Sequence, residues 1–206
     1  MTLADDYLDI AYKTCGVAGL TSRNKYQQID RINHELDKIN SKLTKPMNVK
    51  TTGTINERLV RLALEGFAPS VWYELHEKKY QWLGDFALQG YPLSVVISVK
   101  SFKAKERLLV SGTGSLHAPT IGWGRFDDQK EFSVARLEAY LFRGFLCIYM
   151  PLQTIKKLSV DARNLKNFYG NDFIRDINSF GRDLEKSLVT QRSGSDKINL
   201  VGINTF

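Results

Sequence analysis

The chain has few of the residues that bind transition metals, and it lacks the long apolar runs of a membrane protein. Two cysteines, Cys15 and Cys147, and three histidines occur among 206 residues, without the close spacing of a zinc site. No apolar run approaches the roughly 18 residues that a membrane span needs, and the first residues are acidic, unlike a basic secretory leader. We therefore expect no structural zinc, no membrane span and a reducing cytoplasm as the location.

The glycine-rich segment 111–125 lacks the G-K-[ST] ending of a phosphate-binding loop. This absence excludes the usual signature of an ATP- or GTP-binding enzyme, so we expect no nucleotide cofactor.

What the chain does contain is enough apolar sequence for a core and an excess of positive charge. Its composition is 43% hydrophobic and 11% aromatic, which predicts a single domain over 1–206. We divide it into an N-terminal part (1–53), a central part (54–151) and a C-terminal part (152–206). The 29 basic and 22 acidic residues give a formal charge of +7, which favours a polyanionic partner such as nucleic acid or an anionic membrane face.

Two helices are predicted in the N-terminal part, over 1–20 and 22–43. Apolar residues of the second are spaced as in a coiled-coil seam, but for barely two heptads. The helix therefore either packs on its own domain or forms a dimer contact. The following segment, 44–53, reads as a basic loop.

Met47 in this loop has two interpretations. It either folds back onto the core or acts as an apolar wedge in a DNA minor groove, with Lys45 and Lys50 on flanking phosphates.

The central part reads as a helix, three meandering strands, a second helix and a further strand. Thr54 and Glu57 form a T-x-x-E capping box that predicts a helix start. Strands are predicted over 71–76, 80–88 and 93–102, an irregular segment over 111–125, a helix over 130–142 and a strand over 144–151. This order predicts an α/β (α+β) fold with a mixed central sheet and an N-terminal helical extension. The C-terminal part is polar and basic, and its last residues could add a strand.

An aspartate and a lysine occupy two of these otherwise apolar strands. A hairpin symmetric about Tyr91 and Pro92 places Asp85 opposite Ser98, with Lys100 one step along the same face. Side chains of directly opposed residues lie ~5 Å apart at Cβ. Because burying isolated charges is costly, Asp85 and Lys100 must either form a structural salt bridge or serve a function.

The helix with Glu57, the Gly84-Asp85 pair, the hairpin and the "ISVK" strand ending at Lys100 resemble the catalytic core of the PD-(D/E)XK nuclease superfamily. The resemblance covers about 54–151. It implies that Asp85, Glu57 and the Val99 carbonyl bind Mg²⁺, one or two ions per site, and that Lys100 assists the attacking water. Ser98 replaces the acid of the motif, as in a subset of type II restriction endonucleases with an S-x-K strand. Glu57 is then the candidate for the missing acid.

Glu138, on the helix predicted over 130–142, is the reserve candidate for the missing acid.

Basic residues just beyond the lysine strand are candidates for DNA contacts. Lys103, Lys105 and Arg107 are expected to bind phosphates, or else form a solvated strand end. His117 and Arg125, in the glycine-rich segment, are candidates for reading base edges, with arginine favouring guanine.

The resemblance implies a Mg²⁺-dependent type II restriction endonuclease. We expect it to act on double-stranded DNA as a homodimer at a short palindrome, with CGCG as the candidate sequence, and to leave 5′-phosphate and 3′-hydroxyl ends. Two alternatives are a structure-specific repair nuclease or junction resolvase, and a non-catalytic DNA-binding protein in which Asp85 and Lys100 form a structural pair.

Overall fold

A computed structural model of the chain provides the fold. It describes residues 2–16, 25–45, 47–65, 72–75, 83–91, 93–101, 119–126, 129–193 and 196–206.

Three helices come first, as α1 (Leu3–Cys15), α2 (Lys25–Lys42) and α3 (Val49–Leu64). The strands of the main sheet are β1 (Trp72–Glu74), β2 (Phe86–Leu88), β4 (Val95–Ser101), β5 (Thr120–Arg125), β6 (Phe145–Met150) and β7 (Ile174–Asp176). The helices of the second half are η2 (Gln129–Phe132), α5 (Val134–Phe142), α6 (Leu152–Lys157), α7 (Val160–Asn164), η3 (Ile177–Ser179), α8 (Phe180–Ser187) and η4 (Ile203–Thr205).

The main sheet is mixed and has six strands in the order β1-β2-β4-β5-β6-β7. Strands β1, β2 and β4 form an antiparallel meander, whereas β4, β5, β6 and β7 run parallel. The β2–β4 register pairs Phe86 with Ile97 and Leu88 with Val95, which confirms the predicted hairpin. The expectation of a mixed α/β fold is likewise confirmed.

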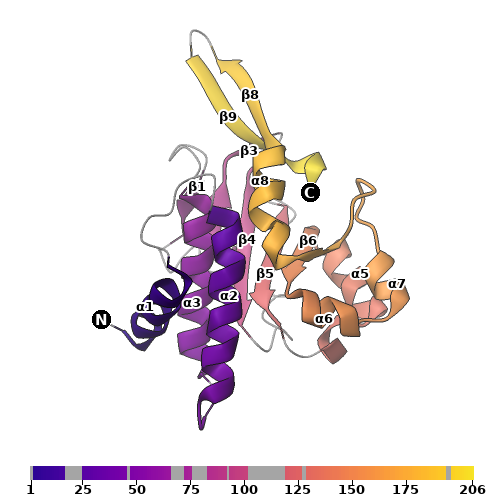
Figure 1. Ribbon diagram of the computed structural model, residues 1–206. Helices are drawn as coiled ribbons and strands as arrows, with labels where there is room; N and C mark the ends of the chain where they lie inside the picture. Colours follow the sequence, from indigo (N-terminus) through magenta and orange to yellow (C-terminus); the bar gives the residue numbers. More distant parts are fainter. Residues whose placement is uncertain are drawn as a thin grey trace.

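Helices cover both faces of this sheet (Figure 1), and each face has its own apolar core. Residues of α1, α2, α3 and α8 pack with Ile97 and Val99 of β4 on one side. Residues of α5 and α7 pack with Phe145 and Ile148 of β6 on the other. Alternate residues of a strand point to opposite faces, so the central strands are buried on both sides and read as continuous apolar runs.

Strand β5 corrects the expectation that 111–125 is irregular. Thr120–Arg125 is a strand between β4 and β6, and its first five residues are buried. Its glycines are typical of a loop, but the neighbouring strands approach too closely for a side chain. A Cβ at Gly122 would meet Ile148 at 3.2 Å, and one at Gly124 would meet the Lys100 carbonyl oxygen at 2.2 Å. The resemblance had implied that α5 and β6 come directly after β4. In the structure they follow β5.

The strand predicted over 80–88 is shorter than expected. Only Phe86–Leu88 is strand, Leu83 and Asp85 lie in a turn and a bend, and residues 80–82 lie outside the described part. Gly84 explains this geometry, because a Cβ there would lie 2.3 Å from Val96 Cγ1 and 2.8 Å from the Ile97 carbonyl oxygen.

Helix α3 begins earlier than the sequence predicts. Asn48 is its N-cap, and the side-chain oxygen of Asn48 accepts a hydrogen bond of 2.8 Å from the Thr51 N–H. Thr54 and Glu57 therefore lie within the helix, and the predicted capping box is wrong. Residues 49–53, expected in a loop, form the start of α3, because the Asn48 side chain bonds one of the otherwise free N–H groups there.

The C-terminal part adds a second, three-stranded sheet in the order β3-β9-β8. Strand β8 (Leu188–Ser193) pairs antiparallel with β9 (Asp196–Gly202), and β3 (Gly90–Tyr91) joins β9 in parallel. The pair β8–β9 extends away from the helices and the main sheet (Figure 1). A C-terminal strand is thus present, as the sequence suggested.

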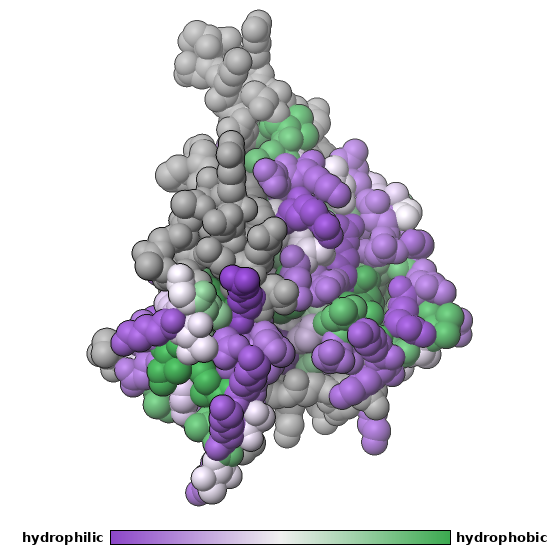
Figure 2. All heavy atoms as spheres, viewed as in Figure 1, coloured by the Kyte–Doolittle hydropathy of each residue, from purple (hydrophilic) through white to green (hydrophobic). Residues whose placement is uncertain are grey.

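No helix in the described ranges combines the length and apolar character needed to cross a membrane. Figure 2 shows hydrophilic side chains over much of one face of the molecule, with smaller apolar areas between them.

The N-cap of α3 can be tested by a matched pair of substitutions. Asn48→Ala is expected to lower the free energy of unfolding by about 1 kcal/mol, because it removes the cap. Thr54→Ala is expected to change it by a few tenths of a kcal/mol at most, since alanine suits a helix interior. Urea unfolding of both variants measures the difference. A large loss for Thr54→Ala with none for Asn48→Ala would instead support the capping box.

Candidate active site

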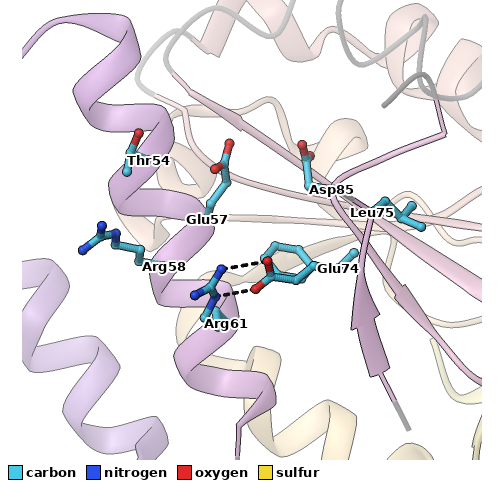
Figure 3. A pocket seen from close by; sticks show the side chains of 8 residues that line it. Thr54, Glu57, Arg58, Arg61, Glu74, Leu75 and Asp85 are labelled. Carbon is cyan, nitrogen blue, oxygen red and sulfur yellow. Dashed lines mark hydrogen bonds and ion pairs between the residues drawn. The ribbon is translucent and has the colours of Figure 1, made fainter. Parts of the chain in front are cut away.

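A pocket of about 580 Å³ lies between α3, β1 and the start of β2. Thr54, Glu57 and Arg61 recur along one side of α3 at helical spacing, and Glu74 and Asp85 face them from the sheet (Figure 3). The pocket therefore combines carboxylates and guanidinium groups. Its lining residues are Thr54, Glu57, Arg58, Arg61, Glu74, Leu75, Asp85 and Phe86.

Asp85 lies at the point where the pocket meets the sheet. Its backbone N–H donates to the Ile97 carbonyl at 2.9 Å, and its carbonyl accepts from the Leu75 N–H at 3.0 Å. The bend at Asp85 is thus bonded to the strands on both sides. Its carboxylate Oδ2 accepts from the Val99 N–H at 2.6 Å and lies 3.3 Å from Lys100 Nζ.

The structure therefore brings Asp85 and Lys100 into contact, as the predicted hairpin required. Both side chains keep partial access to solvent, with 27% of Asp85 and 17% of Lys100 exposed. An ion pair of this kind is open to water and to a ligand that enters from the pocket.

The two residues before Lys100 have different surroundings. Ser98 is fully buried, so its hydroxyl lies inside the sheet layer. The Val99 N–H faces β2, where it bonds Asp85. Because the N–H and carbonyl of one strand residue point to the same side, the Val99 carbonyl also faces β2.

Glu57 reaches the pocket from α3. Its carboxylate makes no hydrogen bond or ion pair with any described residue, although the residue as a whole is exposed. Loss of water against the pocket wall raises the pKa of Glu57, and the nearby negative charges of Asp85 and Glu74 raise it further. Lys100 and Arg61 act in the opposite direction.

Glu138 does not line this pocket; it is exposed on α5. Glu57 and Glu138 were the two candidates for the acid that Ser98 replaces. Of these, Glu57 is the one whose pKa is affected by both Asp85 and Lys100.

Sequence reasoning missed the ion pair at the far side of the pocket. Arg61 Nη2 donates to Glu74 Oε2 at 2.7 Å, and Arg61 Nε also contacts this carboxylate (Figure 3). Arg58 pairs with Asp5 of α1. The spacing of Glu57, Arg58 and Arg61 could have indicated a polar stripe on α3. Glu74, in contrast, reaches it only through the packing of β1 against that helix.

The residues predicted to bind DNA have different positions. Lys45 is exposed after α2, and Lys50 is exposed in the first turn of α3. Met47 is half-buried and packs against the core, as the simpler of its two interpretations has it. Its backbone N–H donates to Asn40 Oδ1 at 2.8 Å.

Arg125 is held inside the fold. Its side chain is only 11% exposed, pairs with Asp37 and donates to the Asn33 carbonyl at 3.2 Å. It therefore ties β5 to α2, and it is not displayed toward DNA bases in this structure. The remaining candidates, Lys103, Lys105, Arg107 and His117, lie outside the described residues.

The carboxylates suit a hard cation with few protein ligands. Within the described residues no three His, Cys, Asp or Glu side chains gather closely enough to form a metal cluster. Mg²⁺, however, usually takes one or two carboxylates together with water and substrate phosphate. Asp85 Oδ1 and both Glu57 oxygens have no hydrogen-bond partner in the described part of the chain. The carboxylates of Asp85 and Glu57 are close enough for the charge of one to affect the other, and these oxygens fit such an ion.

Comparisons with protein-family models, curated proteins and solved structures found no match to the chain.

The raised pKa of Glu57 gives a prediction about stability and pH. A carboxyl group whose pKa is higher in the folded state destabilises that state once ionised, so the penalty is absent at low pH and grows as the pH rises. Without divalent metal, Glu57→Gln is therefore expected to raise the melting temperature at pH 7.5 by about 1–3 °C. Below about pH 4 both side chains are neutral and the difference should vanish.

Glu138→Gln serves as the matched control, because Glu138 is exposed on α5. Thermal unfolding from pH 3.5 to pH 8 compares the two variants with the parent chain. Equal pH profiles for Glu57→Gln and Glu138→Gln would contradict a raised pKa of Glu57 in the pocket.

Proposed function

We propose that the protein is a Mg²⁺-dependent DNA endonuclease of the PD-(D/E)XK type, with the S-x-K form of the motif. The observation that carries this proposal is the contact of Asp85 Oδ2 with Lys100 Nζ at 3.3 Å. It joins the bend before β2 to β4, at the edge of a pocket that Glu57 enters from a helix.

The pair's exposure also favours a functional role over a purely structural one. A structural ion pair in a core would be dry and fully satisfied. Here Asp85 and Lys100 retain access to solvent, and Glu57 opposite them has no partner among the described residues. Burial, and then the negative charge of Asp85, raise the pKa of Glu57, and perturbed carboxyl groups of this kind cluster at functional sites.

In the proposed site, Asp85, Glu57 and the Val99 carbonyl would hold Mg²⁺. The ion would supply a Lewis acid that neutralises charge on the phosphate and lowers the pKa of water. Ser98, where the motif has its acid, is buried and contributes no carboxylate.

Lys100 would act directly on the reacting groups. Its ammonium is held by Asp85, which fixes its position at the end of β4. From there it can orient the attacking water and offset the negative charge that develops on the phosphate oxygens. In-line attack would leave a 5′-phosphate and a 3′-hydroxyl.

Double-stranded DNA is the proposed substrate. The net charge of +7 favours a polyanion, and Lys45 and Lys50 are exposed cations near the start of α3. A single site cuts one strand, so cutting both strands at a palindrome requires a two-fold homodimer. We propose such a dimer, in the cytoplasm, with CGCG as the first sequence to test.

Plasmid digestion with Mg²⁺ tests the proposal. Discrete fragments that share one end sequence are expected from the parent chain. Asp85→Asn and Lys100→Met are each expected to lower the cleavage rate by about 10²–10³-fold, since each removes a group that stabilises developing charge. Glu57→Gln should lower it by a similar factor, whereas Glu138→Gln should leave it unchanged.

The same variants separate the competing functions. Asp85→Asn should still bind the cleavage site in Ca²⁺, as measured by fluorescence anisotropy with a labelled duplex. Cutting confined to branched or nicked DNA would replace the restriction function with a repair function. Intact plasmid together with tight DNA binding would show that the protein binds DNA without cutting it.

A further inference from the structure

Asn56, next to Glu57 in α3, is a buried polar residue whose only side-chain hydrogen bond among the described residues leads to the candidate site. It has no exposed surface, and its Nδ2 donates to the Lys100 carbonyl at 3.2 Å. A carbonyl only accepts hydrogen bonds, so the amide must turn its NH₂ group toward Lys100. The Asn56 Oδ1 atom is then buried and has no hydrogen-bond partner within the part of the chain that the structure describes.

This arrangement is unfavourable for stability alone. A buried polar atom without a partner loses its hydrogen bonds to water and gains none in return. An apolar side chain at position 56 would avoid that loss, because the neighbouring helix residues Ile55 and Leu59 are buried in the apolar core. The contact with Lys100 therefore requires another explanation than packing.

Gly124 of β5 adds a second contact with the same carbonyl. A Cβ at position 124 would lie 2.2 Å from the Lys100 oxygen, a distance no side chain can occupy. The peptide of Lys100 is thus bonded by α3 and closely approached by the backbone of β5. Both contacts involve the backbone of Lys100, whereas its side-chain ammonium contacts Asp85.

The position of Asn56 in the chain links the two halves of the site. Glu57 follows it directly, so one turn of α3 both presents the carboxylate and bonds the lysine's backbone. A shift of α3 along the sheet would therefore move Glu57 and Lys100 together. Reacting groups need this constancy, because small displacements cost large factors in rate.

We propose that Asn56 is a positioning residue, which together with the close approach of Gly124 holds Lys100 in register with Glu57 and Asp85. The proposal rests on the nuclease function for its kinetic effect, but not for the placement of Lys100 itself.

The test compares Asn56→Leu with Asn33→Leu. Asn33 is also buried in a helix, α2, and neither of its side-chain amide atoms has a partner in the described structure. Both variants replace an amide by an apolar group of similar size. Asn56→Leu is expected to lower kcat for plasmid cleavage by about 10–100-fold, with KM for DNA and the melting temperature retained. Asn33→Leu is expected to retain kcat.

A second readout does not depend on cleavage. Brief labelling with an amine-reactive reagent, followed by peptide mass spectrometry, reports the access of reagent to Lys100 in the folded chain. Asn56→Leu is expected to increase labelling of Lys100 severalfold, and Asn33→Leu to leave it unchanged. If the parent chain cuts no DNA, the nuclease proposal fails while this measurement still decides the role of Asn56. Unchanged labelling of Lys100 in Asn56→Leu, or a kcat loss that matches its loss of folded protein, would overturn the inference.

Discussion

The antiparallel pairing of β2 with β4 is the constraint on which the candidate site depends. Asp85 and Lys100 meet because the register that pairs Phe86 with Ile97 places the bend before β2 beside the end of β4, and the Asp85 N–H bonds the Ile97 carbonyl there. A slip of one residue would turn one strand over and send the two charges to opposite faces. The apolar residues of both strands prevent that slip, since it would also expose the core.

Helix α3 has two roles that its sequence interleaves. Ile55 and Leu59 are buried against the sheet, while Glu57 and Arg61 line the pocket. The same helix also sends Asn56 to the backbone of β4. Because core packing fixes the axis of α3, it also fixes the polar residues between the core positions. The desolvation of Glu57 and its repulsion by Asp85 are tolerated because a large apolar surface anchors the helix that carries Glu57.

Some of this arrangement was predictable and some was not. Alternation of apolar residues and a short turn predicted the β2–β4 hairpin and the contact of Asp85 with Lys100. Strand β5 was missed because Gly122 and Gly124 read as loop residues, although each makes room for a neighbouring chain. The start of α3 was misplaced because Thr54 and Glu57 have the spacing of a capping box, whereas Asn48, which has Thr51 and not a glutamate three residues after it, makes the cap.

By itself, the sequence determined the features that depend on neighbours along the chain: helical and strand periodicity, the hairpin register, and the residue types available for binding a cation and phosphate. Only the tertiary structure decided which distant residues share a space. Glu74 meets Arg61, Arg125 meets Asp37, and Asn56 meets Lys100 through contacts between elements. Such contacts depend on how helices and strands pack in three dimensions, and packing has no signature in the spacing of residues along one chain.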